Sequence, residues 1–154
     1  MTTSGARANT SGRILETYIA NVIKQWLGLD PIPHAIWSKN KHYPALVSDV
    51  PFQTIYNTSG RSEFVLFYSD QSGIRVECKW QAVSGSVDEK YPYLLECMKR
   101  VPEKYVFIVT GGGGAKRAAI EWLTQSAKVT ESKYIRVMDM DSFTQILQNI
   151  SKGK

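Results

Sequence analysis

The sequence predicts an α/β fold in which a mixed central β-sheet is flanked by helices on both faces. Three observations lead to this fold class. Apolar residues recur at helical spacing near the start, two neighbouring segments alternate like a β-hairpin, and two later strand-like segments are separated by helices. Hairpin strands are antiparallel, whereas strands joined through helices are usually parallel, so we expect both kinds of pairing in one sheet.

The length and composition suit one folded domain over residues 13–154. The chain has 154 residues, of which 43% are hydrophobic. Residues 1–12 are small, polar and rich in Gly, Ser and Thr, and we expect them to form a disordered N-terminal arm. The sequence has no run of about 18 apolar residues and no signal-like start, so we expect a cytoplasmic protein without membrane contact.

The first half should contain a helix and then irregular chain. The helix is expected over residues 12–27, with Ser11 as its N-cap and Gly28 as its C-terminal stop. Residues 30–60 contain four prolines and mixed polarity. We interpret them as loop with short strands, to which the sequence assigns no register.

A β-hairpin is expected next. Residues 63–69 are rich in aromatic and β-branched residues, residues 70–73 have turn composition, and residues 74–82 alternate between apolar and polar. Glu63 shares a face with Glu77 and Lys79 only if the turn has an odd number of residues or the hairpin contains a bulge. We therefore predict one of these two features.

The second half predicts an alternation of helices and buried strands. We expect a helix over residues 92–100, a buried parallel strand over 104–111 and a helix from about Ala115. Another strand over residues 134–140 should lead into a final helix that is capped by Asp141 or Ser142.

The net charge, the cysteines and the histidines exclude few classes of function. The net charge of +5 and pI of about 9.2 favour a polyanionic partner more than an acidic chain would. Cys78 and Cys97 have neither zinc-ligand spacing nor a disulfide framework. His34 and His42 lie in proline-rich chain, and we interpret both as structural or solvated.

The stretch Arg75 to Gln81, "RVECKWQ", contains the main candidate site residues. Glu77 and Lys79 lie on one face of a strand, and Glu63 can bring a second carboxylate beside them. Two carboxylates and a backbone carbonyl, that of Cys78, suit a hard divalent cation such as Mg²⁺. A lysine beside them can orient water and offset phosphoryl charge. The same spacing also occurs on solvent-exposed strands, so a polar strand face without a catalytic role remains an alternative.

The combination of Glu16 in an early helix, "RSE" at residues 61–63 and "VECKWQ" at residues 76–81 resembles the PD-(D/E)xK nuclease superfamily. Restriction endonucleases and Holliday-junction resolvases belong to this superfamily. The stretch "QAVSGSVDEKYPYL", residues 81–94, is similar to that of small phage or mobile-element members. The resemblance extends from about Gly12 to the last strand. It implies a restriction-endonuclease-like core and, for a phage-encoded chain, location in the host cytoplasm.

The resemblance also implies roles for individual residues. Glu77 corresponds to the central metal ligand and Lys79 to the lysine of the motif, while Gln81 and Glu16 support the site. Glu63 stands where the superfamily usually has aspartate after proline. The implied activity is a Mg²⁺- or Mn²⁺-dependent endonuclease that hydrolyses DNA phosphodiester bonds, with structure-selective cleavage as one form of it.

Contacts to the DNA backbone are expected from five residues: Ser84, Ser86, Lys90, Lys116 and Arg117. For the serines, an ordinary strand-to-helix loop is an equal alternative. Gly111 to Gly114 precede a helix, but they lack the phosphate-loop pattern, and a flexible turn is favoured. Members of the superfamily often act as homodimers, which this sequence leaves open. A non-catalytic DNA-binding module with the nuclease fold, and a basic interaction protein, are the alternative functions.

Overall fold

The computed structural model describes residues 4–81 and 87–153, and it has the mixed sheet that the sequence predicts. Six strands lie in the order β1-β2-β3-β4-β5-β6. The pairs β1/β2, β4/β5 and β5/β6 are parallel, and β2/β3 and β3/β4 are antiparallel. The elements are α1 (Ser4–Leu27), β1 (Pro31–Pro33), α2 (His34–Trp37), β2 (Ala45–Gln53), β3 (Ser59–Ser69), β4 (Ser72–Trp80), α3 (Val87–Met98), β5 (Tyr105–Gly111), α4 (Arg117–Lys128), β6 (Tyr134–Asp139) and α5 (Met140–Lys152).

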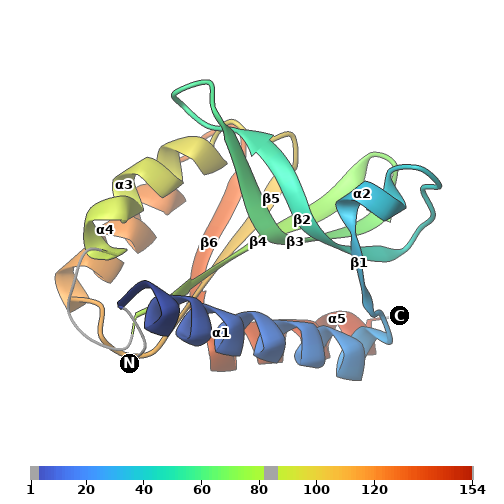
Figure 1. Cartoon of the computed structure of the whole chain (residues 1–154), viewed down its shortest axis with the longest axis horizontal. Coiled ribbons are helices and arrows are strands. Elements are labelled where there is room, and N and C mark those ends of the chain that lie inside the picture. Colours follow the sequence, from blue (N-terminus) through green and yellow to red (C-terminus); the bar gives the residue numbers. More distant parts are fainter. Residues whose placement is uncertain (1–3, 82–86, 154) are drawn as a thin grey trace.

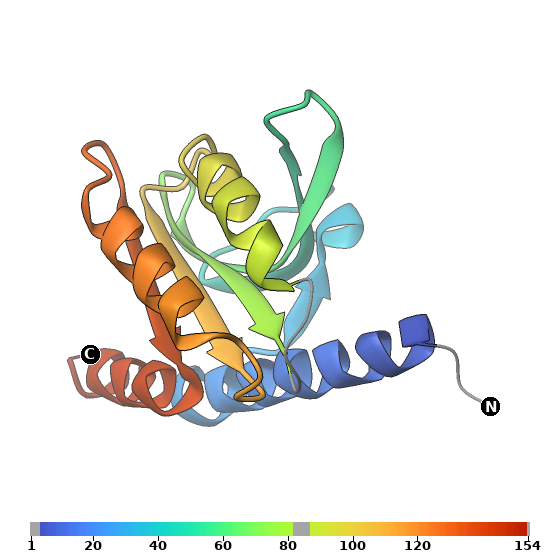
Figure 2. The same ribbon diagram turned by 90° about the vertical axis from the view of Figure 1, so that its left-hand side faces the viewer.

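Helices cover both faces of the sheet, as predicted. Figure 1 shows α1 and α5 side by side along one face, while α3 and α4 lie against the other. Figure 2 shows the same two layers from the side, with α3 and α4 leaning on β4, β5 and β6. The order of the elements accounts for this arrangement, because each β-α-β crossover has to return along a face of the sheet.

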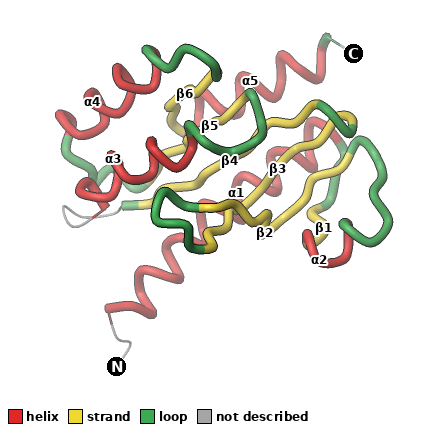
Figure 3. The backbone as a smooth tube through the Cα atoms, turned by 90° about the horizontal axis from the view of Figure 1, so that it is seen from above, coloured by secondary structure: helices red, strands yellow, loops and turns green. Residues whose placement is uncertain are grey.

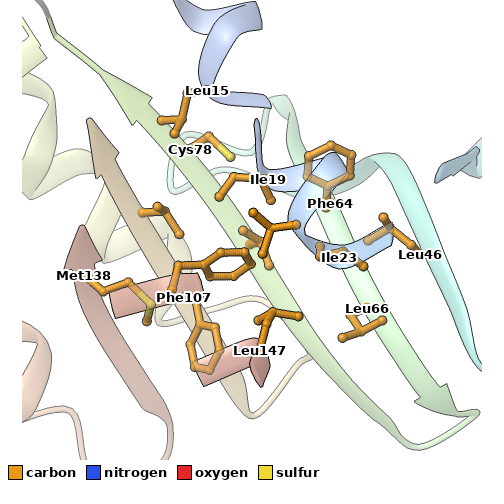
Figure 4. Packing of buried hydrophobic residues seen from close by; sticks show 14 residues of the cluster. Leu15, Ile19, Ile23, Leu46, Phe64, Leu66, Cys78, Phe107, Met138 and Leu147 are labelled. Atoms are coloured by element: carbon orange, nitrogen blue, oxygen red, sulfur yellow. The ribbon is translucent and has the colours of Figure 1, made fainter. Parts of the chain in front are cut away.

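One core cluster joins α1 and α5 to the sheet. The apolar stripe of α1 contributes Leu15, Ile19 and Ile23, which are completely buried. They pack against strand residues that include Phe64 and Cys78, and α5 closes the cluster with further apolar side chains (Figure 4). The cluster therefore fixes α1 across the strands that carry Glu63 and Glu77.

Two further clusters lie on the opposite face. In the larger, Tyr91, Leu95 and Met98 of α3 pack with residues of β5, α4 and β6. In the smaller, Trp37 of α2 stacks on Phe67 of β3, with ring centroids 4.7 Å apart. Between these clusters the same face of β4 carries polar side chains.

The β3–β4 hairpin contains a bulge, one of the two features that the sequence left open. Only two residues separate Ser69 from Ser72, and the register shifts between Phe67 and Ser69. Tyr68 is the extra residue. The bulge restores the register Phe64↔Val76, so Glu63 and Glu77 follow as the next residues on the two strands.

Strands β3 and β4 separate beyond that register pair. The first part of β3 continues pairing with β2 alone, and the end of β4 continues with β5 alone. The β2–β3 hairpin consequently rises away from the rest of the sheet (Figures 1 and 2), and Figure 3 shows the strands β2 to β6 in order from above. This division leaves a fork between β3 and β4, with polar side chains of both strands beside it.

Several element boundaries differ from the sequence-based expectations. Helix α1 begins at Ser4 rather than at Gly12, so residues 4–12 belong to the helix in this structure. Once packing fixes the later turns, each added residue gains a hydrogen bond, and this segment contains no proline. Helix α3 begins at Val87 rather than Pro92, and Asp139, instead of Asp141 or Ser142, caps α5 by accepting from the Ser142 N–H at 2.8 Å.

Residues 30–60 are more ordered than the sequence indicated. They form β1, α2 and the nine-residue strand β2, which pairs with both β1 and β3. Among residues 4–81 and 87–153, no helix has both the length and the apolar character needed to cross a membrane.

Candidate active site

Glu63 and Glu77 meet at the fork between β3 and β4. The Cys78 N–H, which β3 no longer reaches with its backbone, donates to Glu63 Oε2 at 3.1 Å. Glu77 is almost completely buried, and Lys79 follows it on the same face of β4. The fork thus brings together the three residues that the sequence placed on one face.

Both carboxylate oxygens of Glu77 have a partner. Ser62 Oγ donates to Glu77 Oε1, and Lys79 Nζ lies 3.5 Å from Glu77 Oε2. Ser62 in turn accepts from Arg75 Nη1 at 2.8 Å. The sequence analysis assigned no role to Ser62 or Arg75. The alternation of β4 was a signal for Arg75, because it places Arg75, Glu77 and Lys79 in one row.

Lys79 carries its positive charge between two carboxylates. Burial alone lowers the pKa of Lys79, but the charges of Glu77 and Glu63 and the contact with Glu77 outweigh burial, so the pKa is raised. Its side chain is 29% exposed. Lys79 is therefore a cation held beside Glu77 in a partly buried position.

Glu63 behaves differently. Burial, followed by the nearby charge of Glu77, raises the pKa of Glu63 from 4.5 to about 8. The charge of Lys79 and the hydrogen bond from Cys78 act in the opposite direction without cancelling this rise. The two carboxyl groups therefore disfavour each other's ionisation, and a bound cation would favour the charged form of Glu63.

Replacing Glu63 by Gln should change how stability depends on pH. A raised pKa means that the folded state holds the proton more tightly, so this stabilisation is full below pH 4.5 and is lost as pH rises to about 8. In chelator, we expect Glu63→Gln to be more stable than wild type at about pH 9, by on the order of 1 kcal/mol or about 2–4 °C in Tm.

Thermal unfolding from about pH 5 to about pH 9 measures this effect. The matched control is Glu131→Gln, since Glu131 is exposed and outside the fork. The difference between Glu63→Gln and wild type should grow with pH, whereas Glu131→Gln should follow wild type. A constant difference across this range would contradict the assignment of the shifted group to Glu63.

Glu16 approaches the site from α1, accompanied by a residue that the sequence analysis missed. Burial and then the charge of Asp49 raise the pKa of Glu16, while Arg13 and Lys79 lower it. Asp49 is exposed, has a positive φ of 53°, and lies opposite Glu63, between the pairs Ser48↔Phe64 and Val50↔Ser62. Asp49 lies in a segment with several prolines and no clear pattern, so the sequence gave no indication that it lies near Glu16.

Gln81 contacts the glycine-rich loop rather than the carboxylates. Its backbone N–H donates to Gly111 O at 2.9 Å, its carbonyl accepts from Gly114 N–H at 2.6 Å, and its side-chain Nε2 donates to Gly114 O at 3.5 Å. Gly112 and Gly113 have φ of 93° and 71°, which glycine adopts without strain. These contacts favour a strand-to-helix turn that Gln81 holds in place.

The residues expected to contact DNA are only partly described. Ser84 and Ser86 lie outside the described residues. Lys90 is exposed on α3, and Lys116 is exposed at the start of α4, where its backbone N–H donates to Asp88 Oδ2 at 3.3 Å. Arg117 is also exposed and pairs with Glu121 at 2.8 Å, one turn along α4.

Two carboxylates at the fork are candidate ligands for a divalent cation. Within the described part of the chain, no group of three or more His, Cys, Asp or Glu side chains is placed to hold a metal ion. Glu63 and Glu77 supply two carboxylates, and Mg²⁺ typically completes such a set with backbone oxygen and water. Burial and three nearby carboxylates keep the pKa of the Cys78 thiol high, so its sulfur is not a ligand candidate.

Comparison with protein families gives a match over most of the chain. No curated protein matches the chain significantly. The model of the PD-(D/E)XK nuclease superfamily domain matches residues 7–150, a range that begins within α1 and ends within α5. Members of this superfamily usually use divalent metal ions. Since the match spans nearly the whole sequence and the fold agrees with a restriction-endonuclease-like core, the chain belongs to the PD-(D/E)XK nuclease superfamily.

Proposed function

We propose that the protein is a metal-dependent DNA endonuclease whose active site is the fork between β3 and β4. The observation that carries this proposal is the meeting of Glu63, Glu77 and Lys79, which join two carboxylates and a partly exposed lysine in a largely buried site. Membership of the nuclease superfamily supports hydrolysis of nucleic acid. The net charge of +5 supports a polyanionic substrate.

Glu63, Glu77 and the backbone carbonyl of Cys78 would hold Mg²⁺ or Mn²⁺. When bound, such an ion polarises the scissile phosphodiester and makes water a better nucleophile. Glu77 is the more firmly positioned of the two carboxylates, since both of its oxygens contact protein side chains. Glu63 closes the site from β3, where the Cys78 N–H orients its Oε2.

Lys79 orients the attacking water and stabilises the charge that develops on the phosphate. Its ammonium is fixed by Glu77 and is partly exposed, so it can reach a phosphate oxygen at the edge of the fork. Glu16, on the α1 side, supports the water shell around the site. Lys90, Lys116 and Arg117 lie on exposed helix starts, where they would contact the DNA backbone.

Incubation of the protein with a closed circular plasmid and with a branched DNA junction tests this function. Because the circle has no ends, nicking in Mg²⁺ and its absence in chelator are expected of an endonuclease. Faster cleavage of the junction than of a linear duplex would favour structure-selective activity. DNA binding without cleavage under any divalent ion would contradict the proposal and favour the non-catalytic DNA-binding module.

A further inference from the structure

A buried chain of polar contacts leads to Glu77 from the segment that precedes β5. Glu103, just before β5, forms an ion pair with Arg75 Nε. Arg75 Nη1 donates to Ser62 Oγ at 2.8 Å, and Ser62 Oγ donates to Glu77 Oε1 at 2.5 Å. Arg75 is 1% exposed and Ser62 is completely buried, so this chain is shielded from solvent.

The direction of the hydrogen bonds in this chain follows from the chemistry of arginine. A guanidinium group only donates, so the Ser62 hydroxyl must accept from Arg75. The single hydroxyl proton of Ser62 is then directed at Glu77 Oε1. One oxygen of Glu77 is consequently engaged by the protein, and the other, Oε2, faces Lys79.

The outer end of the chain is itself held in place. Lys133 Nζ donates to the backbone carbonyls of Val101 and Glu103, the latter at 2.7 Å. The Arg75 guanidinium also lies over the Phe52 ring, 5.7 Å from its centroid. Arg75 is thus fixed by groups from both sides of the fork, and its own position has little freedom to vary.

We propose that Ser62 is a positioning residue, with Arg75 and Glu103 behind it, which fixes the Glu77 carboxylate for cation binding. The chain holds Oε1 and leaves Oε2 directed toward Lys79 and the cation. This inference rests on the proposed function, because it assigns the roles of residues around the same site. Groups that orient a ligating carboxylate commonly change metal affinity or activity by about 10- to 100-fold when they are removed.

The test is the binding of Mn²⁺ to the protein without DNA, measured by titration calorimetry. Ser62→Ala should bind Mn²⁺ about 10- to 100-fold more weakly than wild type. Alanine fits the same space, so the variant should retain wild-type circular dichroism. It should also bind DNA in chelator with the affinity of wild type, because Ser62 lies too deep to contact DNA.

Two further variants separate positioning from simple loss of stability. Thr54→Val removes another buried hydroxyl, one that bonds to Thr58 within the β2–β3 turn and does not contact Glu77. It should leave Mn²⁺ affinity unchanged even if it lowers Tm. Glu103→Gln keeps the shape of the chain but weakens its hold on Arg75, so it should lower Mn²⁺ affinity less than Ser62→Ala does.

The outcomes distinguish this inference from the proposed function. Wild-type affinity for Mn²⁺ in Ser62→Ala, or no Mn²⁺ binding by wild type, would overturn the positioning role. An equal loss of affinity in Thr54→Val would overturn it as well, since the effect would then be general destabilisation. If wild type binds Mn²⁺ and Ser62→Ala binds it weakly, but neither cleaves DNA, the positioning role stands and the endonuclease proposal fails.

Discussion

Replacing Glu77 by Gln should slow DNA cleavage in Mg²⁺ by at least about 10²- to 10³-fold. Glutamine keeps the size of the side chain but removes the negative charge at the centre of the fork. Its amide also replaces one acceptor oxygen by a donor, which is unsuited to a cation and to the neighbouring Lys79, 3.5 Å from Oε2 in wild type. The measurement is the single-turnover cleavage rate at saturating protein.

The control for this variant is an exposed carboxylate away from the fork. Glu131→Gln has the same change in net charge and should cleave at the wild-type rate. Both variants should bind DNA in chelator with wild-type affinity, since Glu77 is buried. If Glu77→Gln cleaved within about threefold of wild type, Glu77 would not be the central ligand.

Replacing Lys79 by Ala should have the second largest effect, a loss of about 10²- to 10³-fold in the cleavage rate. The variant removes the ammonium that we propose offsets phosphoryl charge, while the two proposed metal ligands, Glu63 and Glu77, remain. The maximal single-turnover rate should therefore fall, while the Mg²⁺ concentration that gives half of this rate should stay close to that of wild type. Single-turnover rates at several Mg²⁺ concentrations separate the two quantities.

Lys90→Ala is the matched control for Lys79→Ala, because it also removes one positive charge but from an exposed position on α3. We expect it to weaken DNA binding and to leave the single-turnover rate at saturation unchanged. A wild-type rate of chemistry in Lys79→Ala would contradict the role assigned to this lysine.

The hairpin shows how much of the site could be predicted from sequence. The alternation of residues 74–82 predicted the face shared by Glu77 and Lys79. Bringing Glu63 to the same face required either an odd-numbered turn or a bulge, and the structure has a bulge at Tyr68. Alternation is a local property with a period of two residues, so it can be read without knowledge of tertiary contacts.

Strand β2 could not be predicted in the same way. Its sequence includes Pro51 and follows Pro44, and it contains Asp49 with φ of 53° in its middle. Proline and a positive φ both argue locally against a strand. Pairing with β1 and β3 overrides these preferences, and such pairing depends on residues that are distant in the sequence.

The chain of contacts behind Glu77 was also beyond sequence analysis. Arg75 was recognisable as part of the polar row, but a charged residue on an alternating strand is usually solvated. Its burial follows from Glu103, 28 residues later, and from Ser62, 13 residues earlier. These three residues come together only through the tertiary packing of the fork, which the local sequence pattern does not reveal.

The central claim is that Glu77 and Lys79 act as one catalytic centre, and a double-variant cycle tests it most directly. The measurement is the single-turnover cleavage rate of one plasmid in Mg²⁺ by wild type, Glu77→Gln, Lys79→Ala and the double variant. When two residues act as a unit, the effects of replacing them on the rate are strongly non-additive. We predict that wild type cleaves and that the double variant is no slower than Glu77→Gln alone. Losses that multiply in the double variant, or a wild-type rate no faster than that of Glu77→Gln, would contradict this account.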